Sequence, residues 1–233
     1  MSERQLAYEA FARSAAGERS GLALYVSVPV ASFRNPHARE YLETYPCPPP
    51  STIYGMLLSA VGETSRRAHA GAEIALAMIS KPALSTVLRT KWRVKSRRAP
   101  LGKGENKVPD FQEVLTDVRM VVWVRRGGEE SASPPLVERL RQVLLHGASA
   151  RRFGALSLGE STHLVDDFRT WRGEDGSRGR VLVRDDERGD LTLPIWADHV
   201  SSMRTRWGRY RLEDGEWGGG LPESAWVRIV PGG

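Results

Sequence analysis

The sequence predicts an α+β fold, and two patterns carry the prediction. Apolar residues recur at every second position over 22–28 and 117–126, as they do in strands, and 73–80 and 163–168 are predicted as two further strands. Apolar residues recur at helical spacing over 51–61 and 134–144. The resulting order, strand, helix, strand, strand, helix, strand, is the βαββαβ arrangement of ferredoxin-like and RNA-recognition-motif folds.

Residues that begin or end elements set the expected boundaries. Pro29 is expected to end the first strand, because proline lacks the N–H that a sheet ladder uses. Ser51 is predicted to be the N-cap of the first helix. Ser133 is predicted to cap the second helix, with Pro134 at its first position and Gly147 at its end.

Three regions are expected along the chain. Residues 1–21 form an N-terminal extension, and residues 22–170 form the ferredoxin-like domain, interrupted by an insertion at about 84–116. Residues 171–233 are Gly-rich and charged and carry hairpin signals, which predicts a small β-rich C-terminal portion. Its tryptophans are expected to be core or interface anchors rather than base-stacking residues.

Composition narrows the classes of function. The 233 residues carry a formal net charge of +6, which suits an anionic partner such as nucleic acid. Cys47 is the single cysteine, so neither an internal disulfide nor a cysteine-based zinc site is expected. A single cysteine is what we expect of a protein in a reducing, cytoplasmic setting. No apolar run is long enough to cross a membrane. The histidines are scattered, so neither a metal site nor a cofactor is expected.

The segment 89–97 alternates basic and uncharged residues without exception. In an extended strand one face carries only cations, and Trp92 lies on the other. The cations are Arg89, Lys91, Arg93, Lys95 and Arg97, and Arg98, Lys103 and Lys107 continue the charge. Such a face is self-repelling, and a phosphate backbone would neutralise it. A solvated edge strand is the alternative; the number of charges favours nucleic acid.

Two further clusters could bind phosphate. The first holds Arg34, Arg39 and Tyr45 and then the start of a helix, whose free N–H groups suit an anion. In that helix Gly55 costs about 1 kcal/mol relative to alanine. Close approach of another backbone or simple helix packing would explain it. The second runs from Arg151 to Ser161 and could form a backbone nest, although by itself a structural turn fits better.

Together these clusters resemble a known family. The segments 31–34 (ASFR), 45–46 (YP) and 48–57 (PPPSTIYGML) are similar to the N-terminal signature of the fifth CRISPR-associated (Cas) protein family. The segments 109–115 (PDFQEVL) and 156–161 (LSLGES) resemble its later motifs. The resemblance covers residues 22–166, and 191–211 fits more loosely.

The resemblance implies a subunit of the type I Cascade complex that binds the 5′ handle of the CRISPR guide RNA. It implies a β-hairpin thumb at about 84–116, and contacts with the seventh-family backbone subunit, the eighth-family large subunit and target DNA near the PAM. The setting is antiviral defence or RNA-guided transposition. The candidate RNA-binding residues are Arg34, Arg39, Tyr45, Ser51, Thr52, Tyr54, Arg89, Lys91, Trp92, Arg93, Lys95, Arg97, Arg98, Lys103, Lys107, Arg151, Arg152, Gly159 and Ser161.

Two alternatives stay open. One branch of the family is a metal-independent endoribonuclease, and here only His37, Tyr45, Tyr54 and the lysines of 84–116 could serve such chemistry. No histidine lies within 84–116, which favours a non-catalytic clamp. The other alternative is a stand-alone RNA-recognition-motif protein, but the aromatic pattern of that class is absent from the expected strand.

Overall fold

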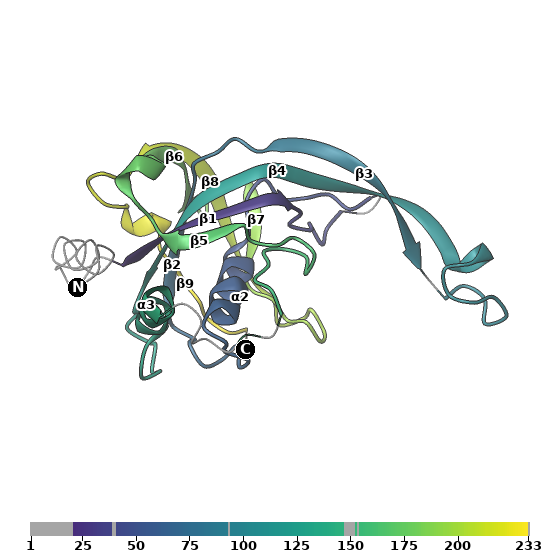
Figure 1. Cartoon of the computed structure of the whole chain (residues 1–233), viewed down its shortest axis with the longest axis horizontal. Helices are drawn as coiled ribbons and strands as arrows, with labels where there is room; N and C mark the ends of the chain where they lie inside the picture. Colours follow the sequence, from purple (N-terminus) through teal and green to yellow (C-terminus); the bar gives the residue numbers. More distant parts are fainter. Residues whose placement is uncertain (1–20, 39–40, 93, 147–151, 153, 233) are drawn as a thin grey trace.

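The computed structural model describes residues 21–38, 41–92, 94–146, 152 and 154–232. Within these residues nine strands form one sheet in the order β5-β1-β4-β2-β6-β8-β7, with β3 paired to β4 and β9 to β2. Every strand pair is antiparallel. The hairpin β3–β4 extends from the body of the molecule (Figure 1), and residues 83–116 are called the arm below. The predicted α+β class is confirmed.

The central strands are β1 (Leu22–Ala31), β2 (Glu73–Met78), β4 (Lys107–Arg125) and β5 (Asp167–Thr170). One face of this group is fully apolar because alternate residues of each strand point to it. On β4 the predicted inward residues have no exposed surface; these are Val118, Met120, Val122 and Val124. The period-of-two prediction for this strand is therefore confirmed.

Two helices, α2 (Pro50–Ala60) and α3 (Leu136–His146), contribute the rest of this core. Both start at residues other than those predicted. Proline fixes a helical φ at a first helical position and needs no hydrogen-bond acceptor there, so α2 begins at Pro50 and Ser51 is not its N-cap. The carbonyl of Pro49 accepts the N–H of Thr52. Similarly, α3 begins at Leu136, beyond Pro134.

Two strand boundaries also differ from the prediction. β1 continues through Pro29 to Ala31. It can do so because β5 pairs only with residues 24–27, so no neighbouring strand requires the N–H that Pro29 lacks. β5 begins at Asp167 rather than at residue 163, since the chain before it forms a turn closed by the Ser157–Leu164 bridge.

The C-terminal residues extend the same sheet. β6 (Arg178–Arg184) pairs with β2, β8 (Arg206–Glu216) pairs with β6, and β7 (Leu191–Trp196) lies at the edge. The short strand β9 (Val227–Arg228) returns to β2. Short 3-10 helices occur at Gly104–Asn106, Gly173–Asp175 and Glu223–Ala225.

The second face of the sheet has its own small core, in which Trp217 packs edge-on against Trp123. Trp196 is buried on the helix side. These tryptophans are core anchors, as predicted. Among the described helices none is both long and apolar enough to cross a bilayer.

Candidate nucleic-acid interface

The arm is a two-stranded ribbon that shares one strand with the core. Its first strand, β3 (Ala83–Trp92), pairs with the first half of β4 from Ala83↔Thr116 to Trp92↔Lys107. Every residue of β3 is exposed. Because the other half of β4 is buried between β1 and β2, the arm is anchored in the sheet while the side chains of β3 remain accessible.

Ser80 and Asp117 fix the place where the arm leaves the sheet. Asp117 has a left-handed backbone with φ 61°. The Ser80 hydroxyl donates to the Asp117 carbonyl at 2.6 Å and accepts the Arg119 N–H at 2.9 Å. The Ser80 side chain thus supplies hydrogen bonds to β4 in the gap between the end of β2 and the start of β3.

The base of the arm does not present the free cationic face expected from its alternation. Arg89 Nη1 lies 2.8 Å from Glu160 Oε2 and also bonds Gln112, and Lys91 forms an ion pair with Asp110. The expectation of uncompensated charge was wrong at these two positions. The acids come from β4 and from a distant loop, which the alternation along one strand does not reveal.

The predicted strand 89–97 also ends early, because β3 stops at Trp92. Asn106 is 1% exposed, and its Oδ1 accepts the N–H groups of Lys95 and Ser96 at 2.8 Å each. Its Nδ2 donates to the Ser96 and Ala99 carbonyls. This one side chain turns residues 95–106 into an ordered loop, so their side chains do not alternate between two faces.

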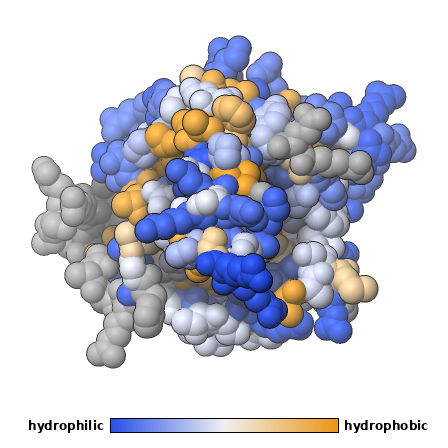
Figure 2. Space-filling model, turned by 90° about the vertical axis from the view of Figure 1, so that its right-hand side faces the viewer, coloured by the Kyte–Doolittle hydropathy of each residue, from blue (hydrophilic) through white to orange (hydrophobic). Residues whose placement is uncertain are grey.

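This loop and Lys107, the first residue of β4, hold the accessible cations. Among the described residues none of these side chains makes an ion pair: Lys95, Arg97, Arg98, Lys103 and Lys107. Beside them Trp92 is 70% exposed and its ring lies over Gly102, where a Cβ would come within 2.7 Å of it. Figure 2 looks onto the end of the arm and shows hydrophilic side chains across the middle of this face. The arm tip can therefore bind phosphates and stack a base.

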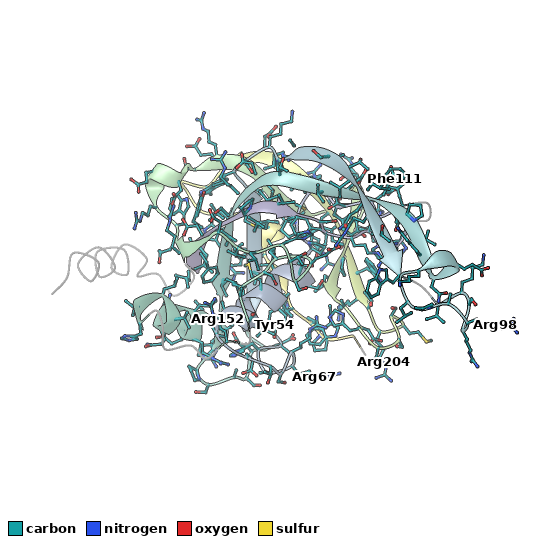
Figure 3. All side chains as sticks on the ribbon, turned by 45° about the vertical axis from the view of Figure 1, so that its right-hand side comes forward. Tyr54, Arg67, Arg98, Phe111, Arg152 and Arg204 are labelled. Atoms are coloured by element: carbon teal, nitrogen blue, oxygen red, sulfur yellow. The ribbon has the colours of Figure 1, made fainter. Side chains whose placement is uncertain are left out.

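The body contributes further arginines without acidic partners among the described residues; among them are Arg34, Arg66, Arg67, Arg204 and Arg206. Figure 3 shows Arg67 and Arg204 along the same edge of the molecule as Arg98 at the arm tip. By contrast, most arginines of the outer strands pair with carboxylates, for example Arg178 with Glu216. Only Arg34 of this set was a candidate from sequence, since single arginines in turns carry no distinguishing pattern.

Residues predicted around helix α2 are mostly interior. Tyr54 is fully buried and its hydroxyl donates to the Arg66 carbonyl at 2.9 Å. Burial raises the pKa of both Tyr45 and Tyr54. Ser51 is 6% exposed, and the Thr52 N–H is already bonded within the helix start. Any part these four play in RNA binding is therefore largely indirect, and their assignment stays a prediction.

The loop 157–163 joins the body to the arm. Gly159 has φ 92°, and a Cβ there would lie 2.5 Å from the Ser32 carbonyl oxygen, so the position requires glycine. His163 Nδ1 accepts the Ser32 N–H at 3.2 Å and the Glu160 N–H at 3.3 Å. Arg152 and Ser161 are exposed. Arg39, Arg93 and Arg151, with residues 1–20, lie outside the described residues.

Glu160 of this loop contacts Arg89 and Gln112 at the base of the arm. Burial disfavours the charged form of Glu160, yet hydrogen bonds from Arg89 and Gln112 outweigh it and hold the pKa of this carboxyl below its ordinary value. Burial also lowers the pKa of His163, as does the nearby Arg89, while Glu160 opposes the shift. His163 is therefore neutral at neutral pH, as its two accepted N–H groups require.

Fold and surface together define an α+β protein built on one antiparallel sheet, with a hairpin arm that ends in cations without an ion-pair partner among the described residues. A family model described as CRISPR-associated protein (Cas_Cas5) matches residues 21–178. The CRISPR-associated protein Cas5 of Myxococcus xanthus (strain DK1622) is 42% identical over 196 residues, which cover 83% of this chain and 90% of that protein. The chain belongs to the Cas5 family, and the predicted resemblance is confirmed.

A solved structure shares the fold. A chain of a CRISPR RNA-guided surveillance complex aligns with a TM-score of 0.57 and 15% identity, covering 91% of each chain. At this identity the match concerns the arrangement of strands and helices.

Proposed function

We propose that this chain is a guide-RNA-binding subunit of a type I CRISPR surveillance complex, and that it clamps the 5′ handle of the RNA without cutting it. Family membership and the fold shared with a chain of such a complex support the proposal. The observation that carries it is the distribution of charge along the arm. The cations at its base are compensated by carboxylates, whereas the described cations of its tip make no ion pair with a described residue.

That distribution is what a phosphate-binding element requires. Five exposed cations at the arm tip, four in the loop and Lys107 directly after it, repel one another, and the repulsion is relieved when a polyanion binds and releases its condensed counterions. Asn106 holds the loop in place before binding, which reduces the entropy lost on association.

The topology supports a ferredoxin-like core. The order β5-β1-β4-β2 has the fourth strand beside the first, then the third and the second, with α2 and α3 as the two connections. In this assignment the domain spans 22–170, the arm is the family thumb, and 171–233 is the C-terminal portion.

The arm also offers a surface for protein partners. Leu84, Leu88 and Phe111 lie on one face of the ribbon, as its register dictates, and are between 55% and 65% exposed. Exposed apolar surface of this kind is typical of interfaces. We assign it to the backbone (seventh-family) subunit, which leaves the large (eighth-family) subunit and PAM-proximal DNA to other faces.

The candidate nuclease residues support a non-catalytic role. Tyr45 and Tyr54 are buried phenols whose raised pKa keeps them protonated at neutral pH, so neither is available as a general base. His37 packs against Trp207 with the ring planes tilted by 42° and the ring centroids 5.1 Å apart. Incubation of the purified chain with repeat RNA in a chelator should leave the RNA intact, and specific cleavage abolished by His37→Ala would contradict this role.

The test of the clamp is RNA retention. The chain is co-expressed with its neighbouring Cas subunits and a CRISPR array, and the RNA in the purified complex is quantified. Arg98→Glu with Lys103→Glu should reduce it at least tenfold. Arg178→Glu with Arg188→Glu, exposed cations of β6 and of the turn that follows it, is the matched control. Equal retention in both double variants would refute the proposal.

A further inference from the structure

A cavity of about 300 Å³ opens beside the C-terminal half of helix α2. Its lining comes from the helix, the turn that follows it and the β7–β8 loop, and includes Gly55, Leu58, Ser59, Gly62, Arg66 and His199. Its volume is at the lower end of the range for small-molecule sites, about 300–1,000 Å³. The predicted RNA-binding residues do not line it.

Gly55 leaves the helix backbone bare inside this cavity. No atom lies within 4 Å of the position that its Cβ would take. Glycine in a helix interior is unfavourable by about 1 kcal/mol, and neither helix packing nor a close backbone in this chain requires it. The contact that would explain Gly55 is therefore with another molecule.

Arg66 forms one wall and is held in position before any ligand arrives. Its guanidinium lies 4.7 Å from the centre of the Trp196 ring, and Nη1 donates to the Ala197 carbonyl at 2.6 Å. The buried hydroxyl of Tyr54 holds its backbone. Burial lowers the pKa of Arg66, but an arginine remains charged at neutral pH. The guanidinium thus lies over the indole ring, and a guanidinium plane is a surface on which a nucleobase can stack.

Charge selects the kind of ligand. Glu63, the acidic residue in the lining, is bound to Arg139 at 2.6 Å, and no other described acid lines the cavity. Around it Arg67 and Arg204 are exposed and make no ion pair with any described residue, and both lie on the edge that leads to the arm tip (Figure 3). This setting attracts a polyanion and disfavours the basic side chain of a partner protein.

We propose that the cavity receives one unstacked nucleotide of the bound single-stranded RNA, with its base against Gly55 and Arg66 and the adjoining phosphates near Arg67 and Arg204. This proposal rests on the RNA-clamp function and extends the RNA path from the arm tip to the body. It also gives Tyr54 a role as a positioning residue for Arg66.

Gly55→Leu tests the proposal without threatening the fold. The leucine meets no atom of the chain near its Cβ and has the better helix propensity, so the melting temperature should not fall. Its side chain would fill the cavity. Gln142→Leu, at an exposed position of α3, is the matched control for an added leucine.

Binding is measured by fluorescence anisotropy with labelled oligouridylate and oligoadenylate of about 16 nucleotides, the upper end of a common footprint. Gly55→Leu should raise Kd about tenfold, in the range for loss of one stacked base. Arg66→Lys, which keeps the charge but loses the plane, should also raise Kd, and 2-aminopurine within the oligomer should show a fluorescence change that Gly55→Leu abolishes.

Three results are distinguishable. If the arm variant Arg98→Glu/Lys103→Glu weakens binding while Gly55→Leu and Arg66→Lys bind as the wild type does, the clamp stands and the cavity proposal fails. If Gly55→Leu binds RNA normally but fails to assemble with the protein subunits, the occupant is a protein and the proposal fails again. If no variant, including that of the arm, affects RNA binding, the clamp function itself is refuted.

Discussion

The two halves of strand β4 place the same backbone in opposite surroundings. Residues 118–124 lie between β1 and β2, with alternate side chains fully buried, whereas residues 107–113 pair only with β3 in the exposed arm over most of their length. In the body, side chains are fixed by packing. In the arm they are fixed by single polar residues, Asn106 at the tip and Ser80 at the base. We therefore expect stability to depend on one half of the strand and the proposed RNA binding on the other, so that different mutations should unfold the chain and weaken its binding.

Matched truncations in the body and in the arm should differ strongly in their effect on the free energy of unfolding. Met120→Ala should lower the free energy of unfolding by about 2–5 kcal/mol, because it leaves a cavity in the core. Leu88→Ala, on the 65% exposed arm residue, should change it by less than about 0.5 kcal/mol. Urea titration followed by circular dichroism measures both. Similar losses in the two variants would mean that the arm packs as part of the core.

The junction between the regions should be the next most sensitive site. Gly159→Ala places a Cβ against the Ser32 carbonyl at a backbone angle that alanine rarely adopts, so we expect a loss of about 1–3 kcal/mol. Gly154→Ala, also at positive φ but with open space around it, is the control and should cost less. The melting temperature of Gly154→Ala reports the cost of a positive φ alone. The further decrease in Gly159→Ala then reports the clash of the new Cβ with the Ser32 carbonyl.

Removal of the Asn106 side chain should affect the loop at the arm tip and leave the body of the sheet unchanged. Asn106→Ala removes the acceptor of the Lys95 and Ser96 N–H groups, at a local cost of about 1–3 kcal/mol. Hydrogen exchange should accelerate for residues 95–106 while β4 residues 118–124 remain protected. RNA affinity should fall through lost order, although no cation is removed. Unchanged exchange in the loop would show that Asn106 does not organise it.

The thermal stability of the chain should depend on pH through His163, which lies at the contact between the body and the arm. The pKa of His163 is below its ordinary value of 6.5. The contribution of this side chain to the free energy of unfolding is therefore complete above pH 6.5, and it is lost as the pH falls through the lowered pKa and the ring becomes protonated. The facing charged groups are Glu160 and Arg89. The expected loss is about 1 kcal/mol, the net value of a hydrogen bond. His163→Gln should remove this part of the pH profile of melting, whereas His146→Gln, in the last turn of α3, should not.

Much of the core could be predicted from sequence, because periodic burial is recorded locally. The inward residues of β1, β4 and α2 were found from spacing alone, and the Cas5 family from separated motifs. Helix starts were missed where proline replaced a capping side chain, at Pro50 and before Leu136. The strand of 89–97 was extended too far because Asn106, a single distant residue, determines where it ends.

The sequence by itself determined the α+β class, the family and the presence of a strongly basic segment, since each depends on the identity and spacing of neighbouring residues. Only the tertiary structure decided which of those charges are available. Asp110 and Glu160 neutralise the base of the arm, from the paired strand and from a loop 71 residues beyond Arg89. Likewise, only folding brings Gly55, Arg66 and His199 around one cavity, because the contacts that shape a binding surface join segments far apart in the chain.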